Sequence, residues 1–280
     1  MVIDAHQHFW QLGKPFNYGW LHSERHQRIC RDYLPADLRP ILGRCGVGKT
    51  VFVQTQHDLA ETRWGLELSD ANDFIAGVVG WVDLRSQECE EQLDEFLEHP
   101  RFVGVRHIVQ DEPDEDFVIR PEFLRGLGVL ERKGVAYDLL FYHQHLGHAA
   151  TLGERFPELR LVIDHLSKPR IREGMLDPWR KQLRAAARFP NVYCKLSGMV
   201  TEADWVNWRA ADLRPYVEEA LEAFGVERCM FGSDWPVCEL AGGYGEVLSA
   251  LVSAMGGLTP TENARIFGGT AAEFYRLKLS

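Results

Sequence analysis

The chain has 280 residues, of which 45% are hydrophobic and 26% are charged, and this balance excludes disordered, collagen-like and coiled-coil proteins. Its 31 Lys and Arg residues against 41 Asp and Glu residues give a net charge of -10, which argues against nucleic-acid and anionic-membrane partners because both bind cationic surfaces. No apolar run reaches the roughly 18 residues of a membrane helix, the N-terminal residues carry no secretion signal, and the six cysteines form no C-x-x-C pair, so we expect a reduced, cytoplasmic protein.

Eight short apolar segments alternate with helical patterns from one end of the chain to the other. Most of these segments are nearly continuous apolar runs, which is the pattern of parallel strands that are covered on both faces. The predicted strands are Val2–His6, Thr50–Gln54, Ala76–Val82, Val103–Ile108, Val135–Phe141, Leu159–Asp164, Val192–Leu196 and Cys229–Gly232.

Helix signals fill the intervals between these strands. Pro121 opens an apolar stripe that Gly134 closes, and Thr259–Glu262 forms a capping box with proline at the first helical position. Eight strands with interleaved helices predict an α/β fold, a (β/α)8 TIM barrel that spans residues 1–280 as a single domain, with a doubly wound open sheet as the alternative. The segment Phe9–Pro40 shows little periodicity, and we expect a loop over one mouth of the barrel.

Polar residues stand where three predicted strands end, which is where a TIM barrel carries its chemistry. The first strand ends in His6-Gln7-His8, and side chains two apart on a strand share a face. The sixth strand is followed by His165 and the eighth by Asp234. Three imidazoles and one carboxylate suit a mononuclear zinc site with open positions for water or substrate. The alternative is that His165 and Asp234 cap loops or helices.

Other strand ends supply candidate contacts to a substrate. We predict substrate-binding roles for Arg106, Gln54, His57, Trp235 and Lys195, and a catalytic role for His107 beside Arg106. Each has an ordinary structural alternative: a surface salt bridge for Arg106, helix packing for His107, core packing for the tryptophan, and an ion pair with a buried carboxylate for Lys195.

One motif imitates a nucleotide-binding loop. The segment 43–50 matches G-x-x-x-x-G-K-[ST], but a phosphate-binding loop needs a strand before it and a helix starting at its lysine. Here Pro35–Leu42 has a helical pattern and Val51–Val53 a strand pattern, so the order is reversed. We therefore predict a helix-to-strand turn and no nucleotide site.

The segments Ile3–Trp10, Leu161–Pro169 and Phe231–Pro236 together resemble the amidohydrolase superfamily, in its branch of sugar-lactone hydrolases such as L-fuconolactonases and L-rhamnonolactonases. The resemblance implies that His6, His8, His165 and Asp234 are metal or substrate-polarising positions and that Asp234 is the general base. Two-metal members add a carboxylated lysine and a further histidine on middle strands. Here Val135–Phe141 contains no lysine, and Val192–Leu196 contains no histidine. One divalent metal, zinc, is therefore expected, although some lactonases of this branch hydrolyse lactones without metal.

The expected reaction is the opening of a sugar-derived aldonolactone, such as L-fuconolactone, to the hydroxy acid. Asp234 would take the proton of the attacking water, with His165 beside it, and zinc or a cluster of histidine and cationic donors would stabilise the oxyanion. A non-hydrolytic decarboxylase, a lyase of the same superfamily, is the alternative and would need apolar walls and an arginine. Gln54, Gln56, His57 and the tryptophans favour the lactone. A silent binding barrel would have no chemical reason to keep all four strand-end residues.

Overall fold

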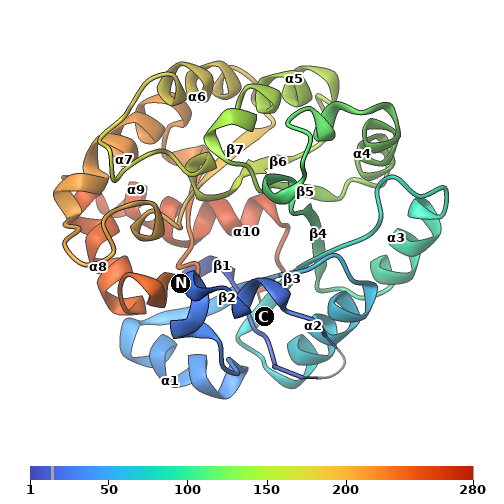
Figure 1. Cartoon of the computed structure of the whole chain (residues 1–280), viewed down its shortest axis with the longest axis horizontal. Coiled ribbons are helices and arrows are strands. Elements are labelled where there is room, and N and C mark those ends of the chain that lie inside the picture. Colours follow the sequence, from blue (N-terminus) through green and yellow to red (C-terminus); the bar gives the residue numbers. More distant parts are fainter. Residues whose placement is uncertain (14–15, 280) are drawn as a thin grey trace.

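The computed structural model of the chain describes residues 1–13 and 16–279. Eight parallel strands form one sheet in the order β1 to β8, and the sheet curves into a nearly closed barrel (Figure 1). The predicted TIM barrel is therefore confirmed. The strands are β1 (Val2–Gln7), β2 (Val47–Val53), β3 (Ile75–Gly80), β4 (Phe102–His107), β5 (Ala136–Leu139), β6 (Leu161–Ile163), β7 (Val192–Leu196) and β8 (Cys229–Phe231).

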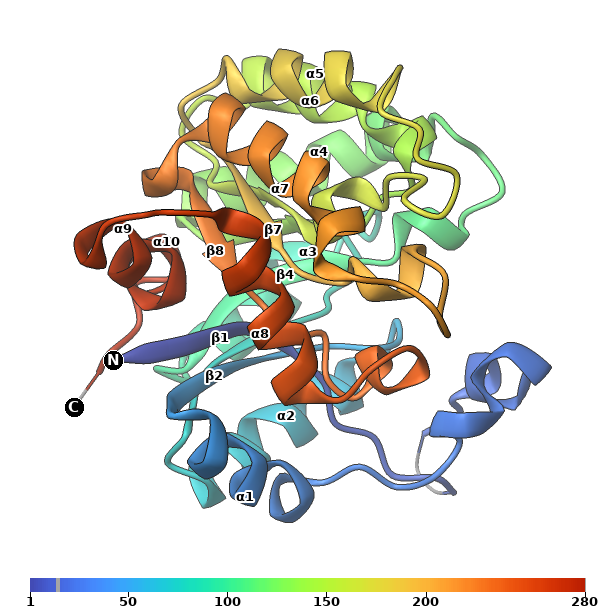
Figure 2. The same cartoon turned by 90° about the vertical axis from the view of Figure 1, so that its left-hand side faces the viewer.

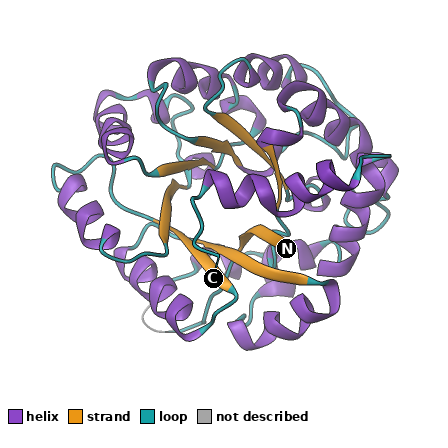
Figure 3. Ribbon diagram, turned by 180° about the vertical axis from the view of Figure 1, so that it is seen from behind, coloured by secondary structure: helices purple, strands orange, loops and turns teal. Residues whose placement is uncertain are grey.

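Helices surround the strands and cover the outer face of the barrel (Figure 3). Buried residues of α1 to α8 belong to one apolar cluster with outward-facing strand residues, which explains the continuous apolar runs of the strands. The helices are α1 (Pro35–Cys45), α2 (Leu59–Ala71), α3 (Cys89–Leu97), α4 (Pro121–Lys133), α5 (Gly147–Arg155), α6 (Trp179–Ala187), α7 (Ala210–Phe224), α8 (Tyr244–Met255), α9 (Pro260–Ala264) and α10 (Thr270–Phe274). Within the described residues, no helix is both long and apolar enough to cross a membrane.

The first and last strands meet beyond their C-terminal ends, where the backbone N–H of His8 donates to the carbonyl of Trp235 at 2.7 Å. Strand β1 also carries a bulge, because Asp4 pairs with Thr50 whereas Gln7 pairs with Phe52. A bulge inserts an extra residue and changes the side on which the following side chains emerge. It thus lets a strand whose early residues fill the apolar interior present histidines to the barrel mouth.

The opposite end of the barrel is closed by the C-terminal part of the chain. Ala271 and Phe274 of α10 pack against Ile3, Val51 and other apolar residues of the barrel interior. Figure 2 shows α9 and α10 at the same end as the N-terminus. The interior is therefore filled from this end, and only the mouth at the C-terminal ends of the strands is available for a site.

The long segment after β1 reaches the mouth, as predicted. Its 3₁₀ helices Gly19–His22 and Glu24–Ile29 are the blue coils that lie far from both termini in Figure 2. Trp10 and Tyr33 exchange two backbone hydrogen bonds of 2.9 and 3.0 Å, which fasten the base of the segment. The predicted bounds were too long at the C-terminal side because α1 already begins at Pro35; residues 14 and 15 lie outside the described residues.

The segment that resembles a phosphate loop is a helix-to-strand turn, as predicted. Helix α1 ends at Cys45, Gly46 adopts a left-handed conformation with φ of 69°, and β2 starts at Val47. Because no helix begins at Lys49, its surroundings contain no helix N-terminus that could bind a phosphate.

Candidate active site

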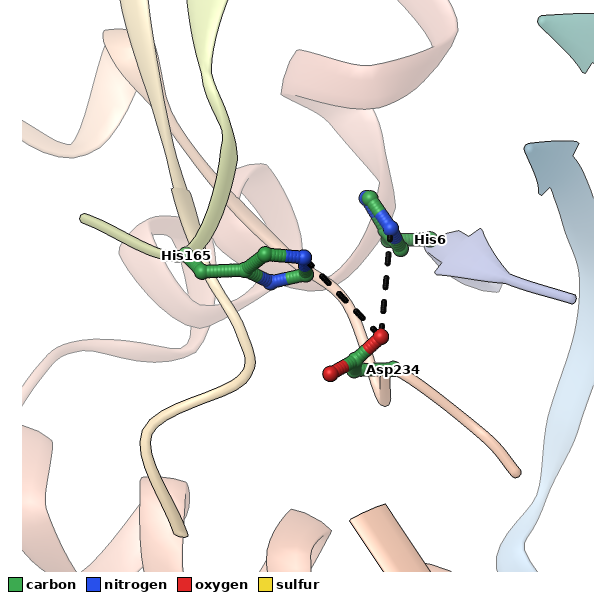
Figure 4. A group of neighbouring side chains, drawn as sticks. All are labelled: His6, His165 and Asp234. Carbon is green, nitrogen blue, oxygen red and sulfur yellow. Dashed lines mark ion pairs between the residues drawn. The ribbon is translucent and has the colours of Figure 1, made fainter. Parts of the chain in front are cut away.

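The four predicted strand-end residues come together at the mouth of the barrel. Nε2 of His8 lies 3.2 Å from Oδ1 of Asp234. Nε2 of His6 and Nε2 of His165 both lie 3.9 Å from the same oxygen, and Figure 4 shows these two contacts. All four side chains are buried. The structure therefore unites residues that are up to 228 positions apart in the sequence around one carboxylate oxygen.

Each of the three imidazoles uses its other nitrogen to contact a protein group behind this cluster. The Nδ1 atoms of His8, His6 and His165 lie 2.7, 3.3 and 2.9 Å from their partners. These partners are the Val53 carbonyl, the Asp164 carboxylate and the Ser197 hydroxyl. The Val53 carbonyl can only accept, so the proton of His8 belongs on Nδ1 and its lone pair on Nε2. Nδ1 of His6 lies 3.0 Å from the Lys195 ammonium as well as near Asp164, so these partners do not fix its proton. The Nε2 lone pair of His8 faces the Asp234 carboxylate, an arrangement that a cation between them would stabilise.

The electrostatics of the cluster favour the same charge states. Burial lowers the pKa of all three histidines, that of His165 to about 4, so the imidazoles are neutral at neutral pH. Burial raises the pKa of Asp234, but the neighbouring His165 and His8 bring it below its ordinary value. Three neutral imidazoles and one ionised carboxylate are a donor set that zinc accepts. The residues present therefore fit a single divalent metal.

A network of buried charges lies directly behind His6. The Lys195 ammonium contacts Asp138 at 2.5 Å and Asp164 at 2.9 Å, and Nη1 of Arg106 contacts Asp164 at 3.0 Å. Lys195 is fully buried and does not line the cavity, so the structure does not bring it to a substrate. Of the two interpretations of this residue, the structure shows the ion pair, because a buried ammonium needs compensating carboxylates.

Arg106 differs from Lys195 because it reaches both the network and the mouth. Its Nη1 lies 3.2 Å from Nε2 of His6, its Nη2 donates to the Gln54 carbonyl, and its side chain lines the cavity. A guanidinium has five N–H donors, so Arg106 can bond to the network and still face a ligand.

A cavity of about 330 Å³ opens in front of this cluster. His8, His165, Arg106 and Asp234 form part of its wall, and the segment after β1 adds Trp20 and other residues. The remaining wall is mixed: it has polar groups from Ser23, Thr55, Gln110, Lys168, Thr201 and Glu202, and apolar side chains from Ile108, Leu140, Val237 and Leu240. The site can therefore hold a small molecule with many hydrogen-bonding groups.

His107 and His57 belong to a second cluster that does not line this cavity. Nδ1 of His107 accepts from the Trp81 indole at 3.3 Å, so its Nε2 donates to Glu112 at 2.7 Å. His57 stacks on His107 with ring centroids 3.8 Å apart, and its Nε2 accepts from the Ile108 backbone at 2.9 Å. Neither His107 nor His57 therefore reaches the cavity for which its role was predicted. For His107 the reason is that adjacent strand residues face opposite sides, and Arg106 is the one that faces inward.

This second cluster also contains three groups that are close enough together to suggest a metal site. Both ring nitrogens of His107 are already engaged, and the Nε2 lone pair of His57 accepts a backbone hydrogen. A metal would have to displace those hydrogen bonds, so the donor set of the second cluster does not fit one.

Gln54 and Trp235 support the site from behind and do not line the cavity. The Gln54 side-chain amide donates to the Arg106 carbonyl at 2.9 Å, which joins the ends of β2 and β4. The Trp235 indole donates to Glu239 at 2.9 Å and packs against Phe9. Both side chains are buried and bonded to protein groups, and their predicted substrate contacts stay a prediction.

Asp4 is a positioning residue that the sequence did not single out. Its carboxylate accepts from the Ser233 hydroxyl at 2.6 Å, the Ser233 backbone at 2.9 Å and the Tyr244 hydroxyl at 2.9 Å. Burial raises its pKa to about 6. These bonds fix the turn in which Asp234 adopts a left-handed φ of 57°, and thereby aim its side chain at the histidines.

Lys168 is the other residue that sequence reasoning left without a role. It lies three positions after His165 and lines the cavity with Tyr142 and Glu202. Burial lowers the pKa of its ammonium, whereas the Glu202 carboxylate raises it. The spacing His165-x-x-Lys168 can be read from the sequence. In an ordinary strand or loop, however, this spacing does not indicate whether both side chains point into the same cavity.

Comparison with known proteins gives consistent results over nearly the whole chain. The family model described as "Amidohydrolase" matches residues 3–277. L-fucono-1,5-lactonases from Burkholderia ambifaria and Burkholderia multivorans are 38% and 40% identical; each alignment covers 98% of this chain, and 95% and 96% of the respective relative. A crystal structure of an amidohydrolase from Burkholderia multivorans with bound zinc has a TM-score of 0.93 and 40% identity, and covers 99% of this chain and 100% of that one.

Proposed function

This chain belongs to the amidohydrolase family, and we propose that it is a lactonase that hydrolyses L-fucono-1,5-lactone or a closely related sugar lactone to the hydroxy acid. The observation that carries the proposal is the convergence of three imidazole rings and the Asp234 carboxylate beside a cavity that His8, His165 and Asp234 line. Relatives of about 40% identity that are named L-fucono-1,5-lactonase support the choice of substrate.

The wall of the cavity offers polar groups that suit a polyhydroxylated ring. Hydroxyl and amide groups of Ser23, Thr55, Gln110 and Thr201 line it, and the Trp20 ring lies among them. The Gln110 side-chain oxygen has no hydrogen-bond partner within the described residues, and a sugar hydroxyl could offset the cost of that buried oxygen. An aromatic face can also pack against a sugar ring.

Asp234 is the proposed general base. Its pKa lies below the ordinary value, so it is ionised at neutral pH and can accept a proton from water. Only Oδ1 makes the contacts to the histidines described above, which leaves Oδ2 for the proton (Figure 4). The alkoxide that leaves the acyl carbon stays tethered in the product, so Asp234 can return the same proton to it and complete the cycle.

His6, His8, His165 and Asp234 would hold one divalent metal, and their donor set suits zinc. When bound, such a metal would polarise the lactone carbonyl and make the attacking water more acidic. Arg106 adds a permanent cation 3.2 Å from His6 on the same wall, where it can bind the substrate and stabilise negative charge. The three histidines are oriented for either role by their Nδ1 partners.

The deciding experiment is a pH-indicator assay on L- and D-aldonolactones with purified protein, after chelation, and after reloading with zinc. We expect acid release from L-fucono-1,5-lactone and its stereochemical relatives, and higher rates after zinc is restored. Equal rates with and without metal would remove the metal from the reaction and keep the lactonase. No acid release across the panel, together with carbon dioxide release from aromatic acids, would replace the lactonase by a decarboxylase.

A further inference from the structure

The four residues 165–168, directly after β6, form a left-handed turn. Their φ angles are 52°, 52°, 59° and 49°, and none of them is glycine. The backbone N–H of Lys168 donates to the carbonyl of His165 at 2.8 Å, which closes the turn. A left-handed φ is unfavourable for a residue with a β-carbon, so such a turn persists only where its surroundings impose it.

The surroundings hold this turn from several sides. The Trp179 indole donates to the Leu166 carbonyl at 2.6 Å, and the Ser167 hydroxyl donates to the Tyr142 carbonyl at 3.1 Å. On the remaining side, a β-carbon on Gly198 would lie 2.5 Å from the His165 ring, so only glycine leaves room for this histidine. What the strained turn achieves is that His165 and Lys168 both reach the wall of the same cavity.

The ammonium of Lys168 is a partly buried cation of this cavity whose donors are uncommitted. It lies 5.1 Å from the centre of the Tyr142 ring, and within residues 1–13 and 16–279 no hydrogen bond or ion pair engages it. Arg106 is partly used by the network behind the site, and Arg25, which also makes no hydrogen bond or ion pair among those residues, is exposed. A partly buried ammonium with free donors is a binding group for an oxygen that carries negative charge.

We propose that Lys168 is a substrate-contacting residue that binds the carbonyl oxygen of the lactone and, in the product, the carboxylate that contains this oxygen and the oxygen of the attacking water. The inference rests on the proposed function, because that reaction turns a neutral ester into an anion in front of His165 and Asp234. The attraction between a positive group on the wall and the substrate oxygen becomes stronger as negative charge develops on that oxygen. The group therefore stabilises the transition state more than the substrate, and this difference raises the rate.

The test compares the wild type with Lys168→Met, and reads ligand binding as well as turnover. Isothermal titration measures the affinity for L-fuconate and for L-fuconamide, its neutral counterpart. We expect the wild type to prefer the acid and Lys168→Met to lose at least about 10-fold of that preference, as for a hydrogen bond to a charged group. We also expect kcat/KM for L-fucono-1,5-lactone to fall about 100-fold, and Lys168→Arg to restore part of both.

Two further variants keep the result interpretable. Lys168→Asn is a second neutral variant that tolerates a left-handed φ, in case the methionine unfolds the turn. Lys181→Met removes an exposed lysine of α6 outside the cavity and should bind and react like the wild type. An unchanged preference for the acid in folded neutral variants, or no L-fuconate binding by the wild type, would overturn the proposal. Absence of lactone hydrolysis by the wild type would instead overturn the proposed function, and the binding data would still decide the role of Lys168.

Discussion

Two groups of histidines lie at strand ends of this barrel, and they differ in what their ring nitrogens contact. In the first group, His6, His8 and His165 contact the protein through Nδ1 and direct Nε2 at Asp234 beside a cavity. In the second group, both nitrogens of His107 are bonded to Trp81 and Glu112. Residue types and proximity are similar in both, so the hydrogen bonds behind a histidine decide whether it can act as a ligand or only as a structural group.

The surroundings of the two groups reinforce this difference. Behind the first group lies a fully buried network of Lys195, Asp138 and Asp164, which fixes His6 from below. The second group is packed into an aromatic stack in which His107 lies against Phe117, with ring centroids 5.0 Å apart. Several buried charges therefore lie at the first group, whereas the second is held by ring packing and by the hydrogen bonds of His107 to Trp81 and Glu112.

The largest effect is expected from Asp234→Asn. The amide cannot take the proton of water, so we expect kcat/KM for the lactone to fall by about 10³-fold or more. The fold should persist because asparagine tolerates the left-handed φ of 57° at this position. Initial rates and a thermal unfolding curve measure both effects. Wild-type kcat in a folded variant would remove Asp234 as the base.

Lys195→Met tests the network behind the first group through stability. Removal of the ammonium leaves the Asp138 and Asp164 carboxylates without their shared partner, and breaking a buried pair typically costs about 3–5 kcal/mol of the free energy of unfolding. Urea denaturation gives this quantity. The control is Lys133→Met, whose pair with Asp94 lies at the surface and should matter far less. Equal losses in the two variants would show that the network contributes little to stability.

The barrel and the four converging residues were predictable from the sequence because apolar runs and strand-end positions are local patterns. The first and last residues of the strands were less predictable. The apolar run Val135–Phe141 extends beyond β5, which covers only Ala136–Leu139, because apolar residues continue into the loop. The sequence does not state which of Arg106 and His107 faces inward. It also contains no signal for the left-handed turn at Lys168, since that turn is imposed by contacts from distant elements.

The smallest effect is expected from Glu112→Gln in the second group. The glutamine oxygen can still accept from Nε2 of His107, so the cluster keeps its hydrogen bond and loses only the charge. We expect kcat/KM and the amount of bound zinc to stay within about 2-fold of the wild type, because a neutral hydrogen bond replaces a charge-assisted one away from the cavity. Metal analysis after zinc loading and dialysis measures the second quantity, with His6→Ala as the variant that should lose zinc. Loss of zinc from Glu112→Gln and retention of zinc by His6→Ala would reverse the assignment of the two groups. The contacts of the ring nitrogens would then fail to distinguish a metal-binding histidine from a structural one.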